Sequence, residues 1–443
     1  MHTALIIDDD ADMRRLMVET LRAEGWQTWD ADSGERGLEL AREHRPRVII
    51  CDLLMPRGNG FQVCRTVRGE PPLQGIRILV TTGRAYESDR KAALEAGADE
   101  YLVKPFDLAE FADRLKQLAG TDRPAAAPPT PPAAPGANAG ETRIRFWGVR
   151  GSIATPGPAT ARYGGNTSCV EVRSGADIII LDAGTGLRPL GRELDAEFGG
   201  RPLTLNLLLS HTHWDHIQGL PFFQPLYRPH NRIRILGYEG ARSGLFKVLS
   251  SQMESPYFPV GLKELPSNVE IDELRDLEFS IGSVQVAAFF ANHPGICVGY
   301  RLTTPGGSVA FFPDNEPPRA APGTGSQAAY AAGEARKFTE FLRGVDVLIL
   351  DAQYDAAEYQ SHVGWGHGCV DDVVGIALAA GVKQLFLFHH DPDHDDAKVD
   401  ELVAHARELV NRAGAALQVD AAREGLTVAL QAGQPAELRG HGQ

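Results

Sequence analysis

The chain has 443 residues, of which 43% are apolar and 23% charged, and its formal net charge is −14. This composition is typical of a folded protein with more than one domain, because single cores seldom grow beyond about 300 residues. The negative charge argues against binding of extended nucleic acid, which is itself a polyanion. The 5 cysteines form no CxxC pair, so the sequence indicates neither a disulfide framework nor a thiolate zinc site.

The first residues, MHTALIIDDDAD, lack the basic start and the long apolar core of a secretion signal. No apolar run approaches the roughly 18 residues that a membrane helix needs. We therefore expect a cytoplasmic protein without membrane contact.

Residues 1–120 alternate short apolar runs with amphipathic helical patterns, such as Met13, Leu16, Met17 and Leu21. This alternation predicts a doubly wound parallel sheet, here of five strands, with helices on both faces. Residues 121–140 are mostly alanine and proline, which predicts an extended linker between domains. Residues 141–443 would then form the second domain.

Charged residues stand at the ends of three expected strands of the first domain. The triplet Asp8 to Asp10 follows the first strand, Asp52 the third and Lys104 the fifth. The carboxyl ends of parallel strands meet at one edge of a sheet, and carboxylates gathered there favour a Mg²⁺ site. An alternative for the aspartate triplet is that it caps the following helix.

The segments DDD, DLLMPRGNG, TTG and YLVKPF together resemble the receiver domain of response regulators over residues 1–120. The resemblance implies a flavodoxin-like fold, a sensor histidine kinase as partner and phosphorylation of Asp52. It implies Mg²⁺ binding by Asp8, Asp9, Asp52 and the Leu54 carbonyl, pairing of Lys104 with the phosphoryl group, and a switch formed by Thr82, Tyr101 and Lys104. Gly83 departs from the alanine that is usual there.

Residues 141–443 contain many β-rich runs, with helical patterns near 333–343, 371–380 and 396–413. This pattern predicts a larger α/β domain with two layers of sheet. After one of these runs comes HTHWDH, which places His211, His213, Asp215 and His216 within six residues. Such a turn can direct two imidazoles at one metal ion and a carboxylate with an imidazole at a second. Any one of the histidines could instead be a hydrogen-bonded loop residue, but four ligand-type residues at this spacing disfavour that explanation.

Further ligand-type residues follow later strands, and their order resembles the metallo-β-lactamase fold, an αββα sandwich, over about 143–430. The resemblance implies two metal ions, with Asp314 bridging them. One ion would be bound by His211, His213 and His293, and the other by Asp215, His216 and His389. We favour His389 over His390 because it directly follows the apolar strand LFLF. His390 is then a supporting or substrate-contacting group, and we expect His394 to be solvated.

Within that fold, LILDAQYDAAEYQSHVGWGHG resembles the ribonuclease Z and phosphodiesterase branch. The resemblance implies that His367 lies near the scissile phosphate and that Asp351 orients it. Two departures are Gly368, where serine is commoner, and Asp351, where ribonuclease Z has glutamate. The segments FWGVRGSIATPGPATARYGGNTSCVEV and LDAGTGLRPLG resemble a bacterial subgroup related to cyclic-nucleotide phosphodiesterases, in which Asp182 would support the metal ligands.

We therefore expect a receiver-controlled phosphodiesterase that cleaves a cyclic nucleotide or another small phosphodiester with a hydroxide shared by two metal ions. Its catalytic groups would be Asp215, His367 and Asp351. Histidine and carboxylate ligands suit Zn²⁺ first, and also Mn²⁺ or Fe²⁺. The alternatives are a ribonuclease Z-like RNA 3′-processing nuclease, a thioester hydrolase of the glyoxalase II kind, and a non-hydrolytic signalling module that contains metal.

Aromatic side chains gather between Pro221 and Leu265. Phe222, Phe223, Tyr257 and Phe258 could stack on a base, but we favour a core or dimer contact for most of them. We expect a homodimer in which phosphorylation acts through domain arrangement or dimerisation.

Overall fold

The computed structural model describes residues 2–53, 55, 60–83, 90, 93–94, 96–120, 140–229, 231–238, 244–317 and 325–439. Most of the expected linker, residues 121–139, lies outside these ranges. Within them, no helix combines the length and the apolarity needed to cross a bilayer.

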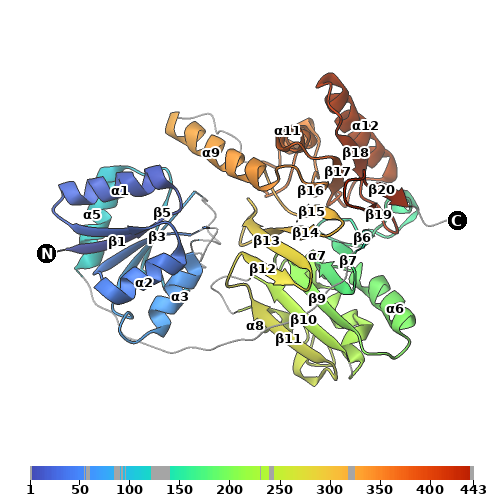
Figure 1. Ribbon diagram of the computed structural model, residues 1–443, viewed down its shortest axis with the longest axis horizontal. Coiled ribbons are helices and arrows are strands. Elements are labelled where there is room, and N and C mark those ends of the chain that lie inside the picture. The colour runs from blue at the N-terminus through green and yellow to red at the C-terminus, as the bar shows by residue number, and fades with distance from the viewer. Residues whose placement is uncertain are drawn as a thin grey trace.

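The N-terminal part is a five-stranded, all-parallel sheet in the order β2-β1-β3-β4-β5, at the left of Figure 1. Its strands are β1 (Thr3–Ile7), β2 (Gln27–Ala31), β3 (Val48–Asp52), β4 (Arg77–Thr82) and β5 (Glu100–Val103). Its helices are α1 (Ala11–Ala23), α2 (Gly34–His44), α3 (Gly60–Gly69) and α5 (Leu108–Ala119). This arrangement confirms the expected doubly wound fold.

The alternation of side chains along a strand explains why helices cover both faces of this sheet. Along β1, Leu5 and Ile7 join one buried cluster, which includes residues of α2 and α3. Ala4 and Ile6 join another, which includes residues of α1 and α5.

The C-terminal part contains two sheets. An eight-stranded sheet has the order β11-β10-β9-β8-β7-β6-β19-β20, and a seven-stranded sheet has the order β12-β13-β14-β15-β16-β17-β18. The strands of the first sheet are β6 (Thr142–Gly148), β7 (Cys169–Ser174), β8 (Asp177–Leu181), β9 (Thr204–Leu209), β10 (Arg232–Gly237), β11 (Asn268–Glu273), β19 (Thr427–Leu430) and β20 (Glu437–Arg439). Those of the second are β12 (Glu278–Ile281), β13 (Val284–Phe290), β14 (Val298–Thr304), β15 (Gly307–Phe312), β16 (Val347–Asp351), β17 (Gln384–Phe388) and β18 (Gln418–Ala421).

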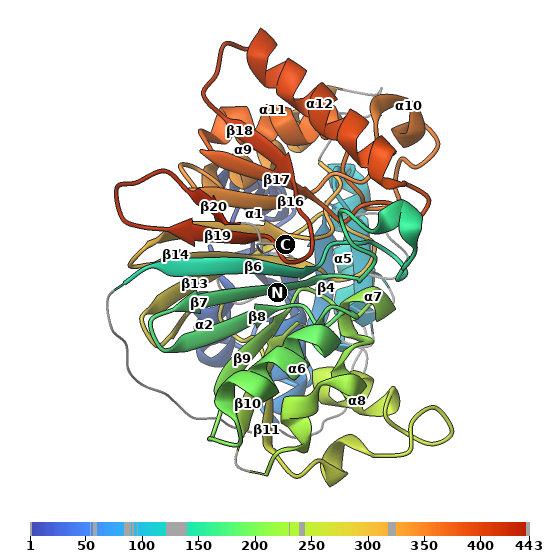
Figure 2. The ribbon, with the colours of Figure 1, turned by 90° about the vertical axis from the view of Figure 1, so that its right-hand side faces the viewer.

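Helices cover the outer face of each sheet, as Figure 2 shows with α11 and α12 above and α6 and α8 below. The helices are α6 (Leu187–Phe198), α7 (Trp214–Ile217), α8 (Leu245–Ser251), α9 (Gly325–Phe341), α10 (Ala356–Tyr359), α11 (Val370–Ala380) and α12 (Asp396–Arg412). Short 3₁₀ turns lie at Pro158–Thr160, Leu220–Phe222, Gln224–Tyr227 and Leu262–Glu264. The layers confirm the expected αββα sandwich.

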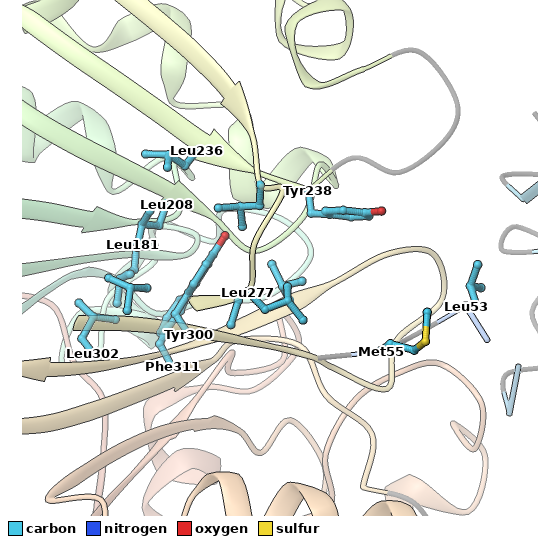
Figure 3. Packing of buried hydrophobic residues seen from close by; sticks show 14 of the residues in the cluster. Leu53, Met55, Leu181, Leu208, Leu236, Tyr238, Leu277, Tyr300, Leu302 and Phe311 are labelled. Carbon is cyan, nitrogen blue, oxygen red and sulfur yellow. The ribbon is translucent and has the colours of Figure 1, made fainter. Parts of the chain in front are cut away.

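Buried apolar residues of the two sheets meet between the layers. Leu181 and Leu208 from the eight-stranded sheet lie in one cluster with Tyr300 and Leu302 from the seven-stranded sheet (Figure 3). The same cluster extends into the N-terminal part of the chain, where it includes the fully buried Met55. The two parts of the chain therefore share apolar contact as well as the linker.

An ion pair also joins the two parts. The Lys337 Nζ atom on α9 lies 3.2 Å from Asp9 Oδ2 at the end of β1. Lys337 and the aspartates of the N-terminal part thus meet at the edge of the five-stranded sheet where the expected Mg²⁺ ligands lie.

Candidate functional site

The residues of the HTHWDH segment lie where parallel strands of the sandwich end. In the first sheet β8 pairs with β9, and in the second β15 pairs with β16 and β16 with β17, all in parallel. Loops at these carboxyl ends therefore gather at one edge of the sandwich. His211 and His213 follow β9, Asp215 and His216 lie on α7, His293 follows β13, Asp314 follows β15, Asp351 ends β16 and His389 follows β17.

Three overlapping groups of ligand-type atoms form at this edge, and the third of them consists of Asp314, His367 and His389. His211, His213, His293 and Asp314 make up the first, and Asp215, His216 and His389 the second; within each group the ligand atoms lie within 4.8 Å of one another. The first two groups contain the two ligand sets expected from the sequence, and Asp314, the expected bridging residue, belongs to the first. His213 is exposed while the other ligands are buried, so the first group opens to solvent.

Asp314 lies between the first two groups. Its Oδ1 atom is 3.0 Å from His216 Nε2 and 3.2 Å from His389 Nε2. Its Oδ2 atom is 3.7 Å from His211 Nε2 and 3.6 Å from His293 Nε2. Each oxygen of this carboxylate therefore faces one set of imidazoles, as a bridging ligand requires.

The residues present fit divalent metal ions. The His211 Nε2, His216 Nε2 and Asp314 Oδ1 atoms are buried without a hydrogen-bond partner, although buried polar atoms are normally paired. These atoms face one another across the short distances given above. Nitrogen and carboxylate oxygen donors in sets of three or four are the ligands that Zn²⁺ and related ions prefer.

The other ring nitrogen of most of these histidines is held by a neighbouring group. His216 Nδ1 donates to Asp182 Oδ2 at 2.7 Å, and His293 Nδ1 donates to the Gly366 carbonyl at 3.0 Å. His211 Nδ1 lies 3.1 Å from Ser210 Oγ, and His389 Nδ1 lies 3.3 Å from Gln353 Oε1. Such bonds fix the ring and its tautomer and leave Nε2 free to bind a metal ion.

The backbone near the site is constrained. Asp182 and His389 adopt left-handed φ angles of 63° and 60°, which are unfavourable for residues with a side chain. A Cβ atom on Gly151 would lie 2.4 Å from His389 Nδ1, so this glycine permits a close approach of the chain to the ligand. The adjacent Ser152 N–H donates to Asp215 Oδ2 at 2.8 Å.

The charges of the site attract a cation. Burial lowers the pKa of His293 to about 3 and the pKa of His211 well below its ordinary value, so both are neutral donors. Burial opposes a charge on His216 too, but the carboxylates of Asp215, Asp314 and Asp182 raise its pKa well above the ordinary value. The second group of ligands therefore favours positive charge at its centre.

His367 and Asp351 form a hydrogen-bonded pair beside the first two groups. His367 Nδ1 donates to Asp351 Oδ2 at 2.9 Å and lies 3.9 Å from Asp314 Oδ2. Burial disfavours the imidazolium, but the Asp351 carboxylate raises the pKa of His367 to about 9. A Cβ atom on Gly368 would lie 2.2 Å from the Asp351 carbonyl oxygen, so the glycine at this position matches the close packing around the pair.

The neighbouring histidines have other partners. His390 is buried and its Nε2 donates to the Ala422 carbonyl at 2.9 Å, whereas the His389 ring faces the ligands. The expectation that His394 is solvated is wrong. His394 is 7% exposed because its Nε2 lies 3.0 Å from Glu358 Oε1 and its carbonyl accepts a hydrogen bond from Arg150.

The aromatic residues between Pro221 and Leu265 divide into two kinds. Phe223 is fully buried, and Phe258 packs against the same outer core. Phe222 and Tyr257 are 54% and 79% exposed. Phe223 and Phe258 are therefore core residues, which is half of the four and not the majority expected from the sequence, and a dimer contact of Phe222 or Tyr257 stays a prediction.

The N-terminal part holds a second cluster of charged residues. Lys104 Nζ lies 2.8 Å from Asp8 Oδ2 and 2.5 Å from Asp52 Oδ1, and all three residues are buried. Burial, together with the charges of Asp8 and Asp9, raises the pKa of Asp52 to about 7, although Lys104 opposes this shift. Asp9 is 19% exposed at its side chain.

Of the aspartate triplet, only Asp10 is the helix cap. Its Oδ1 accepts the N–H groups of Asp12 and Met13, both at 3.0 Å, while Asp8 points toward Lys104. Thr82, the last residue of β4, and Tyr101, the second residue of β5, are both buried. Leu54, the expected carbonyl ligand, lies outside the described residues.

Sequence reasoning missed three residues that hold the site. Ser210, Gln353 and Glu316 contact ligands or the loop before His367. Ser210 directly precedes His211 and Glu316 lies two residues after Asp314, so their closeness to ligands in the chain is a signal that could have found them. Gln353 lies two residues after Asp351, so the same kind of signal applies to it.

Two known protein families match separate parts of the chain. Residues 4–116 match the response regulator receiver domain, and residues 178–390 match the beta-lactamase superfamily domain. The response regulator MprA of Mycobacterium sp. (strain KMS) is 37% identical over 127 residues, which cover 29% of this chain and 54% of that protein. The chain thus spans about half the length of the curated relatives it matches.

Solved structures also resemble the C-terminal part. The metallo-beta-lactamase fold protein YhfI from Bacillus subtilis has 19% identity and a TM-score of 0.47, and the match covers 66% of this chain and all 100% of that one. A diphosphatase from the PhnP family has 19% identity and a TM-score of 0.44, with 65% and 96% covered.

Proposed function

Because the chain carries a receiver domain followed by a β-lactamase-fold domain, we propose that it is a metal-dependent phosphodiesterase whose activity the receiver controls. The observation that carries this proposal is the sharing of Asp314 between two sets of ligands beside the His367–Asp351 pair. This arrangement offers a place for two cations and, next to them, a proton donor.

The metal-binding residues in this proposal are His211, His213, His293 and Asp314 for one ion and Asp215, His216, His389 and Asp314 for the other. Divalent ions bound there act as Lewis acids, lower the pKa of bound water and neutralise the charge of a phosphate. Zn²⁺ suits the donor set best, and Mn²⁺ or Fe²⁺ also fit it.

His367 is the proton donor in this proposal. With its pKa raised to about 9, the ring is protonated at neutral pH. Its Nδ1 proton is held by Asp351, so Nε2 is the atom that donates a proton to the oxygen of the departing alcohol. Asp351 also accepts the N–H groups of Asn315 and Gln353, both at 3.1 Å, and is therefore itself fixed.

The substrate class we propose is a cyclic nucleotide or another small phosphodiester. The net charge of −14 opposes the approach of a long polyanion, which weighs against an RNA-processing nuclease. A small substrate carries little charge and can reach the ligands through the open side at His213.

The test is turnover of bis(4-nitrophenyl) phosphate and of a panel of cyclic mono- and dinucleotides by the Zn²⁺- or Mn²⁺-loaded protein. We expect hydrolysis of at least one cyclic nucleotide, and His367→Ala should reduce that rate by about 100-fold or more. His405→Ala is the control, because this partly exposed histidine of α12 pairs with Asp371 of α11, away from the ligands. A metal-loaded protein inert toward every phosphodiester would contradict the proposal and favour a non-hydrolytic module.

We further propose that a sensor histidine kinase phosphorylates Asp52, with Mg²⁺ held by Asp8, Asp9, Asp52 and the Leu54 carbonyl. Lys104 would pair with the phosphoryl group, and Thr82 and Tyr101 would change arrangement with it. The Lys337–Asp9 ion pair supports control of the second domain, because it joins α9 to the acidic cluster. The continuous apolar cluster through Met55 supports it as well (Figure 3).

Treatment with beryllofluoride, a phosphoryl mimic, tests this control. We expect the hydrolysis rate or the oligomeric state to change in the wild type and not in Asp52→Ala. Sedimentation before and after treatment also tests the proposed homodimer. Equal rates and equal sedimentation in both states would contradict control by the receiver.

A further inference from the structure

The loop between α10 and α11 brings an exposed tip and a buried base next to the metal ligands. Val363 and Trp365 at the tip are 63% and 59% exposed. Gly366 and His367 at the base are buried, and His367 is 9% exposed. A loop with such an exposed apolar tip needs fixed contacts at its base to keep His367 in place.

Glu316 provides those contacts. It is 5% exposed and lies two residues after Asp314. Its Oε1 accepts the Gly364 N–H at 2.9 Å, its Oε2 accepts the Gly366 N–H at 2.9 Å, and the Tyr359 hydroxyl donates to Oε1. Hydrogen bonds to a carboxylate are stronger than those to a neutral acceptor, so one side chain holds the loop at two amides and also holds the end of α10 through Tyr359.

The held loop contacts both the metal ligands and the proton donor. The Gly366 carbonyl accepts the His293 Nδ1 proton at 3.0 Å, and the next residue is His367. Gly366 has a φ of +89°, and a Cβ atom there would lie 2.4 Å from His293 Nδ1. The loop backbone and the His293 ring therefore fit closely.

Glu316 is itself tied to the loop that carries His293. Its N–H donates to the Asn292 carbonyl at 2.8 Å, and Asn292 Nδ2 donates to the Glu316 carbonyl at 2.9 Å. Glu316 therefore connects three segments: the one after Asp314, the one before His293 and the loop before His367.

We propose that Glu316 is a positioning residue that acts through His367, a role that rests on the proposed phosphodiesterase function. The carboxylate holds the loop so that His367 faces the leaving oxygen of the substrate. Glutamine is a sharp test, because its side chain has one acceptor oxygen and a donor NH₂ group. The NH₂ group would oppose one of the two glycine N–H donors.

The first experiment compares Glu316→Gln with Glu171→Gln in the full-length, metal-loaded protein. Glu171 is 1% exposed and accepts a hydrogen bond from Trp147 at 3.1 Å, so it matches the burial of Glu316 away from this loop. The substrates are a cyclic nucleotide, whose alkoxide leaving group needs a proton, and bis(4-nitrophenyl) phosphate, whose nitrophenolate does not.

For Glu316→Gln we expect kcat to fall by about 100-fold on the cyclic nucleotide and by less than about threefold on the nitrophenyl ester, because general acid catalysis is worth at least about 100-fold. Glu171→Gln should change both rates by the same factor. Equal losses on both substrates in Glu316→Gln, or no loss on either, would overturn the proposal.

A double-mutant cycle gives a second readout. If Glu316 acts through His367, Glu316→Gln should reduce the cyclic-nucleotide rate of His367→Ala by less than about twofold, because the two changes remove one function. A further 100-fold loss would mean that Glu316 acts independently of His367 and would overturn the proposal.

Hydrogen–deuterium exchange of a peptide covering residues 360–368 separates this proposal from the proposed function. We expect Glu316→Gln to speed exchange at the Gly364 and Gly366 amides by about tenfold or more, whether or not any phosphodiester is cleaved, and Glu171→Gln to leave it unchanged. Unchanged exchange in Glu316→Gln would overturn the positioning role. If the wild type cleaves no phosphodiester but exchange is faster in Glu316→Gln, the role of Glu316 in holding the loop stands. That result would count against the phosphodiesterase function alone.

Discussion

The acidic cluster of the receiver and the ligand cluster of the second domain both lie at the carboxyl ends of parallel strands, but they balance their charges differently. In the receiver, Lys104 contacts Asp8 and Asp52 directly, so a cation is part of the chain. In the second domain, Asp314 faces imidazoles, and the His211 and His216 Nε2 atoms lack hydrogen-bond partners. The first cluster therefore contains its own cation, whereas the second presents unpaired donor atoms that suit an added cation.

Replacing Asp314 gives the largest effect expected from this comparison. Asp314→Ala removes an oxygen from each ligand set. Loss of a group that only supports a ligand lowers metal affinity by about 10- to 100-fold, so loss of Asp314 should lower it by more than about 100-fold. Phosphodiester turnover should be lost with it. Metal content after dialysis, measured by mass spectrometry, checks this, with Asp420→Asn on the partly exposed end of β18 as the control. Full metal content in Asp314→Ala would contradict the proposal that the cluster in the second domain binds metal ions through Asp314.

Removing the lysine should make the receiver cluster resemble the metal centre. Lys104→Met leaves Asp8 and Asp52 buried without their cation, which should destabilise the receiver by about 3–5 kcal/mol. Millimolar Mg²⁺ should restore part of this loss by binding the folded state. Hydrogen exchange of β3 measures the change, and Lys116→Met, on the surface of α5, should alter it little. A stable, Mg²⁺-independent Lys104→Met protein would contradict the comparison.

The proton donor gives a dependence on pH. His367 has a raised pKa of about 9, so the imidazolium is present below that pH and the rate should fall as the pH rises through about 9. In Asp351→Asn, burial acts without the carboxylate, the pKa of His367 falls, and the declining limb should move to lower pH. At pH 8 the expected loss is about 100-fold on a cyclic nucleotide, and it should shrink as the pH is lowered. The rate should be measured from about pH 5 to about pH 10 in the wild type and in Asp351→Asn. If the rate declines at the same pH in both proteins, His367 is not the proton donor.

A feature of the fold or of the candidate site could be predicted from the sequence where it depends on residues close together in the chain. The HTHWDH spacing places four ligand-type residues in one turn, and Asp314 and His389 each follow an apolar strand, so these could be named without coordinates. The two sheets and their layers could be predicted for the same reason, since strands such as β16 and β17 are wholly buried and strongly apolar. The edge strands β11 and β12 were not predicted, because few of their side chains are buried.

Other features depend on contacts between distant parts of the chain. His394 stands in a charged segment that suggests exposure, but Glu358 and Arg150 bury it. The Lys337–Asp9 pair joins residues 328 positions apart, and neither side chain carries a pattern that indicates the other. Glu316 resembles an ordinary loop acid until its hydrogen bonds to Gly364 and Gly366 are known.

A smaller effect is expected for the residue that supports His216. Asp182→Asn replaces the acceptor of the His216 Nδ1 proton and should lower metal affinity by about 10- to 100-fold. Asp177→Asn is the control, because this partly buried aspartate accepts hydrogen bonds from Ser283 in a turn away from the ligands. Competition with a zinc-binding dye measures both variants. Equal affinities in the two would mean that His216 needs no support.

The smallest effect is expected at the contact between the domains. Lys337 competes with Mg²⁺ for Asp9, and an ion pair with this much exposure contributes little, so Lys337→Ala should raise the Mg²⁺ affinity of the receiver by at most about fivefold. The Mg²⁺ concentration that half-saturates phosphorylation by acetyl phosphate reports this affinity. Lys383→Ala, which removes an exposed lysine paired with Asp346, should leave it unchanged. A lower affinity in Lys337→Ala would mean that the lysine does not compete.

The left-handed backbone at Asp182 and His389 has a consequence for how this domain could be altered. Each of these residues holds a conformation that costs about 1–2 kcal/mol for any residue except glycine. Glycine would carry no such penalty, but it would remove the Asp182 acceptor for His216 and the His389 ring of the proposed metal site. Substituting glycine at these two positions to raise thermal stability should therefore lower metal binding and activity.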